Sequence, residues 1–190
     1  FSWRGDGVKK LIRLNKNWCS LSTSGLRNGS KSRTPAMMDT AFFEDNFSRM
    51  PVISVHPITE QDVPALLSLI LELADYEHLE VVTTEKDLLR DGFGPNRKFR
   101  SLIAEYDGKA AGYAMFYDFY SSFRGRCGLF LEDIYVQPAL RNKGIGKALL
   151  SHVAKIARNE NYFGMQWEVL DWNQPSIEFY ERIGGKFMAE

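Results

Sequence analysis

The chain has 190 residues, of which 44% are hydrophobic and 25% are charged, a composition typical of one soluble domain of ordinary size. Its 24 basic side chains equal its 24 acidic ones, so overall charge favours neither nucleic acid nor a membrane as a partner. No apolar run approaches the roughly 18 residues of a membrane span. The few cysteines and histidines lack the spacing of a disulfide framework or a metal site, so we expect no metal and a reducing compartment, the cytoplasm.

Residues 1–36 differ in composition from the rest of the chain. They contain eight basic side chains and one acidic residue, Asp6, and they are rich in serine, asparagine and glycine. Such a segment cannot bury enough apolar surface to offset its ordering entropy. We therefore expect residues 1–49 to be a disordered extension before a domain over residues 50–190. Non-native sequence upstream of Met50 is the preferred interpretation, while a mitochondrial targeting segment and a basic interaction tail stay open.

The remaining residues alternate between strand and helix patterns. Thr59 and Thr84 each precede acidic residues, which predicts two helix starts. Asp107-Gly108 predicts a hairpin turn, because glycine tolerates positive φ. In chain order we predict a strand at 52–55, two helices beginning near 59 and 84, strands at 99–105, 111–120 and 129–136, a helix at 147–158, a strand at 163–170 and a helix at 175–183. This order, βααβββαβα, predicts an α+β fold with a mixed sheet flanked by helices.

The loop Arg141-Asn142-Lys143-Gly144-Ile145-Gly146 lies between a predicted strand and a predicted helix. Its glycines let the backbone approach a ligand closely, and the helix that follows directs free N–H groups at it, so the loop predicts a phosphate site. A P-loop is excluded, because Arg141 and Ala148 stand where a glycine and a hydroxyl are required. A dinucleotide fingerprint is excluded, because Leu149 stands at the third glycine.

Motifs on both sides of this loop narrow the prediction. Leu131-Glu132-Asp133-Ile134-Tyr135-Val136 precedes it, and Trp172-Asn173-Gln174-Pro175-Ser176-Ile177-Glu178-Phe179-Tyr180-Glu181-Arg182 follows it. Together with Arg-x-x-Gly-x-Gly, they resemble the GNAT acetyltransferases, and most closely the diamine (spermidine/spermine) acetyltransferases and their bacterial relatives. The resemblance covers about residues 52–186 and not the first 49.

The resemblance implies a GNAT-type mixed sheet with one or two further strands at the C-terminal end. Because the chain stops at Glu190, we expect the C-terminal strands to be missing from the domain at 50–190. Those strands would cover a sheet edge and help to form a homodimer in the full-length protein.

The resemblance also implies acetyl-CoA as cosubstrate. The pyrophosphate would bind the loop and the helix N-terminus, with Arg141 as the main cation. The pantetheine arm would pair with the strand around Ile134 where it separates from the strand at 163–170. The residues expected to bind acetyl-CoA are Ile134, Tyr135, Val136, Arg141, Asn142, Lys143, Gly144, Ile145, Gly146, Lys147, Asn173 and Ser176.

Three side chains are expected at the reacting atoms. The resemblance implies that Glu132 acts as general base through water and that Asp133 attracts the amine. Because adjacent strand residues point to opposite faces, we expect one of them to face the cleft or to lie at a bulge and the other to face a helix. Tyr180 is the expected general acid, since a phenol with a pKa near 10 stays protonated and can donate to a thiolate, whose acid has a pKa of about 8.5.

The acceptor side is less specific in sequence. Glu77, Glu80 and Trp172 match positions that contribute to amine binding in the resembled enzymes. The turn at 121–128 departs from them, because Arg124 and Arg126 would repel a long polyamine. We therefore predict N-acetylation of a primary amine of a small molecule, which is a diamine, polyamine or lysine analogue. A protein N-terminal or lysine acetyltransferase and a non-catalytic acetyl-CoA-binding module stay as alternatives.

Overall fold

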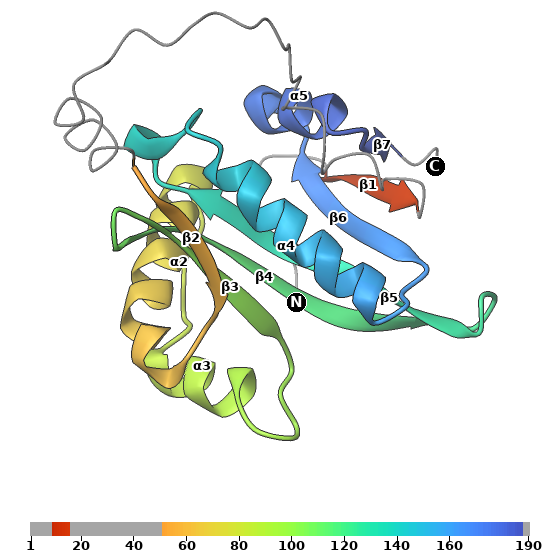
Figure 1. Cartoon of the computed structure of the whole chain (residues 1–190), viewed down its shortest axis with the longest axis horizontal. Helices are drawn as coiled ribbons and strands as arrows, with labels where there is room; N and C mark the ends of the chain where they lie inside the picture. Colours follow the sequence, from red (N-terminus) through yellow and green to blue (C-terminus); the bar gives the residue numbers. More distant parts are fainter. Residues whose placement is uncertain (1–8, 16–50, 188–190) are drawn as a thin grey trace, which may run out of the picture.

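The computed structural model describes residues 9–15 and 51–187 of the chain. Its strands form one seven-stranded sheet in the order β2-β3-β4-β5-β6-β1-β7, with helices on its faces (Figure 1). The elements are β1 (Lys9–Asn15), β2 (Ile53–Pro57), the 3-10 turn η2 (Glu60–Asp62), α2 (Val63–Glu77), α3 (Glu85–Gly92), β3 (Arg100–Tyr106), β4 (Lys109–Ser121), β5 (Arg126–Val136), the 3-10 turn η3 (Pro138–Leu140), α4 (Ile145–Asn159), β6 (Gly164–Leu170), α5 (Gln174–Arg182) and β7 (Lys186–Phe187).

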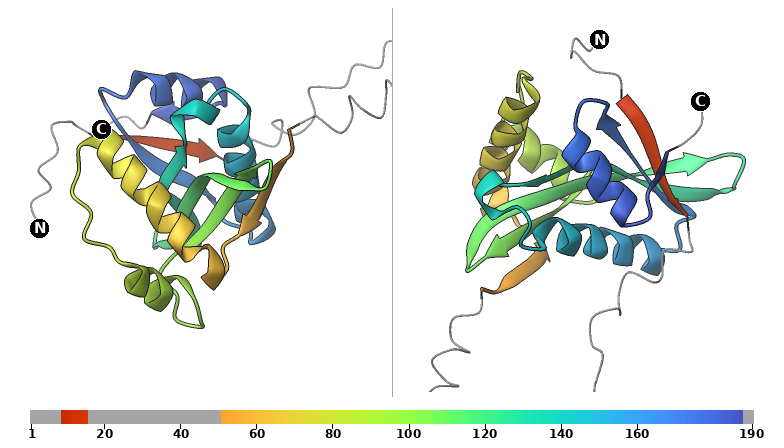
Figure 2. Two further views of the ribbon diagram at one scale, coloured as in Figure 1. Left: turned by 90° about the vertical axis from the view of Figure 1, so that its left-hand side faces the viewer. Right: turned by 90° about the horizontal axis from the view of Figure 1, so that it is seen from above.

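The helices divide between the two faces of the sheet. α2 and α3 pack on one face around Leu66, Leu88 and Tyr113. α4 and α5 share the larger core on the other face, which includes Leu149 and Trp167. Figure 2 shows α2 and α4 on opposite sides of the strands. The predicted α+β fold is therefore confirmed. No helix in the described part of the chain is long and apolar enough to cross a membrane.

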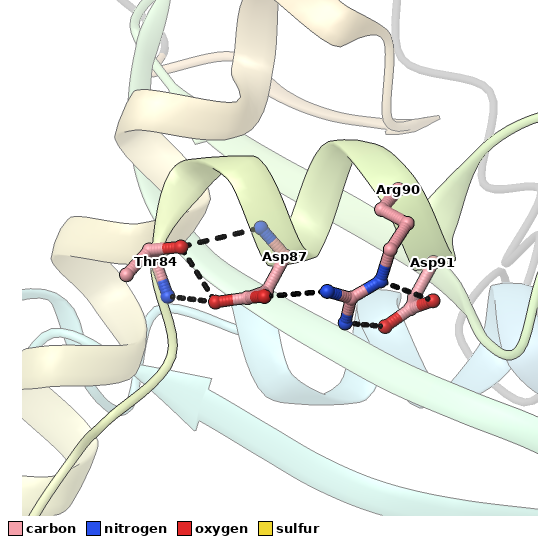
Figure 3. Close-up of polar contacts among 4 residues, drawn as sticks. All are labelled: Thr84, Asp87, Arg90 and Asp91. Carbon is pink, nitrogen blue, oxygen red and sulfur yellow. Dashed lines mark hydrogen bonds and ion pairs between the residues drawn. The ribbon is translucent and has the colours of Figure 1, made fainter.

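The second helix begins where the sequence predicts. The Thr84 backbone N–H donates to the Asp87 carboxylate at 3.1 Å, and the Asp87 N–H donates to the Thr84 hydroxyl at 3.3 Å, a reciprocal capping box (Figure 3). Arg90 pairs with both Asp87 and Asp91 on the exposed side of this helix. Both charge pairs are solvent-exposed, so they add little stability, and the cap is what places α3.

The strands that build the cleft separate partway along their length. β5 and β6 pair in parallel at Leu129, Phe130 and Leu131, opposite Met165, Gln166 and Trp167. No further β5–β6 pair forms in the described residues, although β5 continues to Val136 and β6 to Leu170. The family resemblance implied a separation between these two strands, and in the described residues their pairing ends at Leu131.

The expectation of a disordered extension over residues 1–49 is wrong for Lys9–Asn15. These residues form β1, antiparallel to β6, with Ile12 opposite Trp167 and 1% exposed in the core. β1 also pairs with β7, so these two strands continue the sheet beyond β6 (Figure 1). The rest of the predicted extension lies outside the described residues.

Candidate active site

A cleft of about 800 Å³ opens at the separation of β5 and β6, within the size range of small-molecule sites. Its wall contains the ends of both strands, the last turn of α2, the N-terminus of α4, one side of α5 and one residue of β1. Residues far apart in the sequence therefore meet around one opening. The sequence-predicted residues that line it are Glu77, Glu132, Asp133, Ile134, Tyr135, Val136, Arg141, Asn142, Gly144, Ile145, Gly146, Lys147, Asn173, Ser176 and Tyr180.

The loop before α4 has the backbone form of an anion site. Asn142 and Gly144 have φ values of 64° and 90°, and α4 begins at Ile145. Within the described residues, no side chain caps this helix, so its first N–H groups and its positive dipole end face the cleft at Gly146. Such an end holds a phosphate without further groups. Lys147 adds a positive charge to the same wall.

Arg141 is held at the end of β5. Its Nε donates to the Val136 carbonyl at 3.0 Å, and its guanidinium lies 4.9 Å above the Tyr76 ring. Both contacts fix the side chain where it lines the cleft beside the α4 N-terminus. Lys143 does not share this wall, since its ammonium lies 4.6 Å above the Tyr106 ring. Of the three cations predicted to bind the phosphates, Arg141 and Lys147 therefore line the cleft, and Lys143 does not.

Glu132 and Asp133 both line the cleft. The expectation allowed a bulge at one of these residues and placed the other against a helix. β4 pairs Met115 with Asp133 and Phe116 with Leu131, so Glu132 is an extra residue in β5. Such a β-bulge breaks the strict alternation of side chains. Neighbouring carboxylates can therefore serve one site, with Glu132 exposed and Asp133 partly buried.

The environment of Asp133 favours its neutral form. Burial and the nearby Glu132 raise the pKa of this carboxyl from its ordinary value of 3.8 to about 7, although a hydrogen bond from Tyr113 opposes the change. The Tyr113 hydroxyl donates to Asp133 Oδ2 at 3.1 Å. Burial likewise raises the pKa of Glu77 across the cleft. Groups with shifted pKa values inside a cleft are typical of functional sites.

Tyr180 lines the cleft from α5 and is only 6% exposed. Its ring lies 5.1 Å from the Trp167 ring, which fills the core beneath it. Burial, with the nearby charges of Glu77 and Asp133, raises the pKa of the Tyr180 phenol above its ordinary value of 10. The hydroxyl is therefore protonated near neutral pH and can donate a proton to a reacting group.

Asn173 positions the start of α5. Its side-chain oxygen accepts from the Ser176 N–H at 3.4 Å, as a helix cap, and from the Tyr76 hydroxyl at 3.4 Å. Tyr76 therefore joins Arg141, beside the loop before α4, to the cap of the helix that carries Tyr180. Tyr76 carries no functional signal in the sequence, because a tyrosine at helical spacing in α2 is typical of an ordinary core residue.

The acceptor side differs from the sequence prediction in two positions. Glu80 is exposed outside the cleft wall, and Trp172 packs on Tyr76, 5.9 Å between ring centroids, rather than lining the cleft. Glu168 of β6 and Lys9 of β1 do line it, and their side chains pair at 3.4 Å. Glu168 was not predicted as a site residue, because a charged residue in a strand does not by itself indicate a binding site. Lys9 was not predicted because it lies in the segment that was expected to be disordered.

The described residues contain no group of three or more histidine, cysteine, aspartate and glutamate side chains that could hold a metal ion. The cleft thus combines an anion-binding helix end, a cluster of carboxylates and a protonated phenol. These groups suit a reaction in which a phosphate-bearing donor meets a cationic acceptor.

Comparisons with known proteins agree with this arrangement. A family model described as the acetyltransferase (GNAT) family matches residues 66–185. The thialysine N-epsilon-acetyltransferase of Sus scrofa is 35% identical over an alignment of 151 residues, and the match covers 74% of this chain and 88% of that protein. The human spermidine/spermine N(1)-acetyltransferase-like protein 1 is 42% identical over an alignment of 132 residues, and the match covers 65% of this chain but 19% of that protein.

A solved structure with a similar fold is an aminoglycoside acetyltransferase from an uncultured soil metagenomic sample, in complex with trehalose. It aligns with a TM-score of 0.62 and 16% identity, over 70% of this chain and 87% of that one. At this identity the likeness concerns the fold alone.

Proposed function

Since the chain belongs to the acetyltransferase (GNAT) family, we propose that it transfers the acetyl group of acetyl-CoA to a primary amine of a small molecule. The amine attacks directly in a ternary complex. One observation carries this proposal: a single cleft joins the α4 N-terminus to Asp133 and Tyr180. The similarity to a thialysine N-epsilon-acetyltransferase and to a spermidine/spermine N(1)-acetyltransferase-like protein supports a small amine as acceptor.

The residues present fit acetyl-CoA. The N–H groups at Ile145, Gly146 and Lys147 would hold the pyrophosphate, and Arg141 would pair with a phosphate oxygen. In the described residues β5 does not pair with β6 beyond Leu131, so its edge from Glu132 to Tyr135 would offer backbone groups to the pantetheine amides. When bound, acetyl-CoA supplies a thioester carbonyl that an amine can attack.

The carboxylates would prepare the amine. A primary amine has a pKa near that of lysine, about 10.4, so it arrives as an ammonium and must lose a proton. Asp133 and Glu77 attract the ammonium, and Glu132 takes the proton through a water molecule. The neutral nitrogen then forms the C–N bond at the thioester carbon, while a backbone N–H near Ile134 stabilises the oxyanion by roughly 3–4 kcal/mol.

Tyr180 would complete the reaction. As the C–S bond breaks, its hydroxyl donates a proton to the departing sulfur, and the resulting phenolate recovers a proton from solvent. Starting from the ammonium, the nitrogen loses two protons, one before the attack and one as the amide forms. One proton is gained by the thiol and the other is released to solvent, so atoms and charge balance. The presence of both Glu132 and Tyr180 in the cleft weighs against a non-catalytic acetyl-CoA-binding module.

Tyr180→Phe in the full 190-residue chain tests this mechanism. Loss of a general acid should lower kcat by roughly 100-fold or more, while acetyl-CoA binding measured by calorimetry stays within about twofold, since the ring is retained. Tyr120→Phe is the matched control, because Tyr120 is 66% exposed and outside the cleft wall. Unchanged kcat in Tyr180→Phe would show that another group protonates the thiolate.

A further inference from the structure

The acceptor side of the cleft carries a cation that comes from the far end of the chain. Glu77 of α2, Asp133 of β5 and Glu168 of β6 line this side, and they would draw any ammonium toward it. Lys9 of β1 lies among them, with its Nζ 3.4 Å from Glu168 Oε2. A lysine in such a place changes which molecules the acidic side can accept.

The register of β1 explains why Lys9 faces the cleft. Lys9 pairs with Leu170 and Leu11 with Glu168, so the side chains of Lys9 and Glu168 share one face of the sheet. Ile12 lies on the opposite face, in the core beside Trp167, and is 1% exposed. That buried side chain anchors β1 and thereby fixes the position of Lys9.

The electrostatic contacts of Lys9 reach both carboxylates that would bind the amine. Burial raises the pKa of Glu77 and of Asp133, and in each case the charge of Lys9 acts against that rise. The ammonium is therefore close enough to influence both groups. Its side chain is 39% exposed, so a substrate can contact it from the cleft.

We propose that Lys9 is a specificity-determining residue that binds a carboxylate of the acceptor, and this rests on the proposed amine acetylation. A basic amino acid or its analogue has an ammonium at one end and a carboxylate at the other. Asp133 and Glu77 would bind the first, and Lys9 the second. A lysine ammonium has three N–H donors, so it can contact Glu168 and a substrate carboxylate together.

The same residue disfavours a bare diamine or polyamine. The second ammonium of such a molecule would meet Lys9, where like charges repel. A basic amino acid and a diamine each have an ammonium that the carboxylates of the cleft can bind. Lys9 distinguishes between them because it attracts the carboxylate of the amino acid and repels the second ammonium of the diamine. Discrimination of this kind uses repulsion against one ligand as well as attraction for the other.

Lysine and cadaverine form the matched substrate pair, because cadaverine is lysine without its carboxylate. The wild-type chain should have the higher kcat/KM for lysine. Lys9→Gln should lower kcat/KM for lysine by about two- to fivefold, the value of a partly exposed ion pair, and leave or raise that for cadaverine. Lys9→Arg, which keeps the charge, should restore the preference.

Lys10→Gln is the control variant. Lys10 is adjacent in β1, is exposed, and points to the opposite face of the sheet from Lys9. It should leave both kcat/KM values unchanged. Thermal unfolding of each variant measures whether β1 still stabilises the sheet.

Failure of the proposed role of Lys9 and failure of amine acetylation would give different results. Equal losses for lysine and cadaverine in Lys9→Gln, or a wild-type preference for cadaverine, would overturn the role of Lys9 while amine acetylation stands. Wild-type chain that acetylates neither amine would overturn amine acetylation itself, and the inference with it. A lysine-specific loss that Lys9→Arg reverses would support the inference.

Discussion

Replacing Asp133 by asparagine should make the protein more stable and less active at pH 8. The carboxyl is partly buried, and its pKa is raised from 3.8 to about 7 by burial first and by Glu132 second. The folded state therefore holds the proton more tightly than the unfolded chain does. This contribution to stability is fully present below pH 3.8 and is lost as the pH rises through about 7.

The size of this stability change follows from the difference between the pKa of Asp133 in the folded protein and its ordinary value. The pKa rise is about three units, and each unit corresponds to about 1.4 kcal/mol, which gives an upper limit of about 4 kcal/mol. Because the cleft is open to water, screening should reduce the effect to about half, or ~2 kcal/mol. An asparagine avoids this cost, and its side-chain oxygen can still accept the hydrogen bond from Tyr113.

Urea unfolding at several pH values measures this prediction. The free energy of unfolding of Asp133→Asn, relative to wild type, should rise by ~2 kcal/mol at pH 8, shrink toward pH 5 and vanish near pH 4. Glu80→Gln is the control, since Glu80 is exposed outside the cleft wall, and it should stay within about 0.5 kcal/mol of wild type throughout. A loss of stability at pH 8, or an equal change at every pH, would refute the reasoning.

Further predictions concern activity, the loop and β1. Wild-type kcat/KM should increase as the pH rises through about 7, where Asp133 ionises; a profile flat from pH 6 to pH 8 in initial-rate assays would contradict a role for this carboxylate. Gly144→Ala should lower the free energy of unfolding by roughly 1–2 kcal/mol, because Gly144 has a φ of 90°, even though a Cβ there would meet no atom within 4 Å. The same variant should bind acetyl-CoA more weakly in calorimetry. Unchanged affinity would show that the loop does not bind the pyrophosphate. Ile12→Ala should lower the free energy of unfolding by about 2–5 kcal/mol, whereas an unchanged urea midpoint would show that β1 contributes little to the sheet.

Much of the fold could be predicted from local signals. Thr84 and Asp87 form the expected capping box, and Asp107-Gly108 forms the expected turn with positive φ at both residues. The start of the first helix differs from the prediction, because a short 3-10 turn precedes it. Thr59 caps the short turn η2, and α2 begins at Val63.

What sequence could not supply depends on contacts between distant segments. The seven residues of β1 lie within a long basic stretch whose overall composition predicts disorder. Only pairing with β6 makes Ile12 a core residue. The bulge that turns both Glu132 and Asp133 into the cleft arises from the register of β4 against β5. Lys143 differs from the prediction because Tyr106 lies within reach of its ammonium.

The predicted homodimer and the cytoplasmic location stay proposals from the sequence. The acceptor of a protein or peptide type also stays an alternative that direct assay decides. Peptide and small-molecule acceptors can be compared in the same reaction, so the assay that tests the central claim also ranks them.

The most direct test of the account is acetyl transfer by the full 190-residue chain. Acetyl-CoA would be mixed with lysine, cadaverine, spermidine or a lysine-containing peptide, and free thiol and acetylated product would be measured together. The account predicts thiol release that matches formation of an N-acetylated small amine, with activity abolished or greatly reduced in Tyr180→Phe. Acetylation of the peptide alone, or acetyl-CoA binding without turnover of any amine, would contradict it.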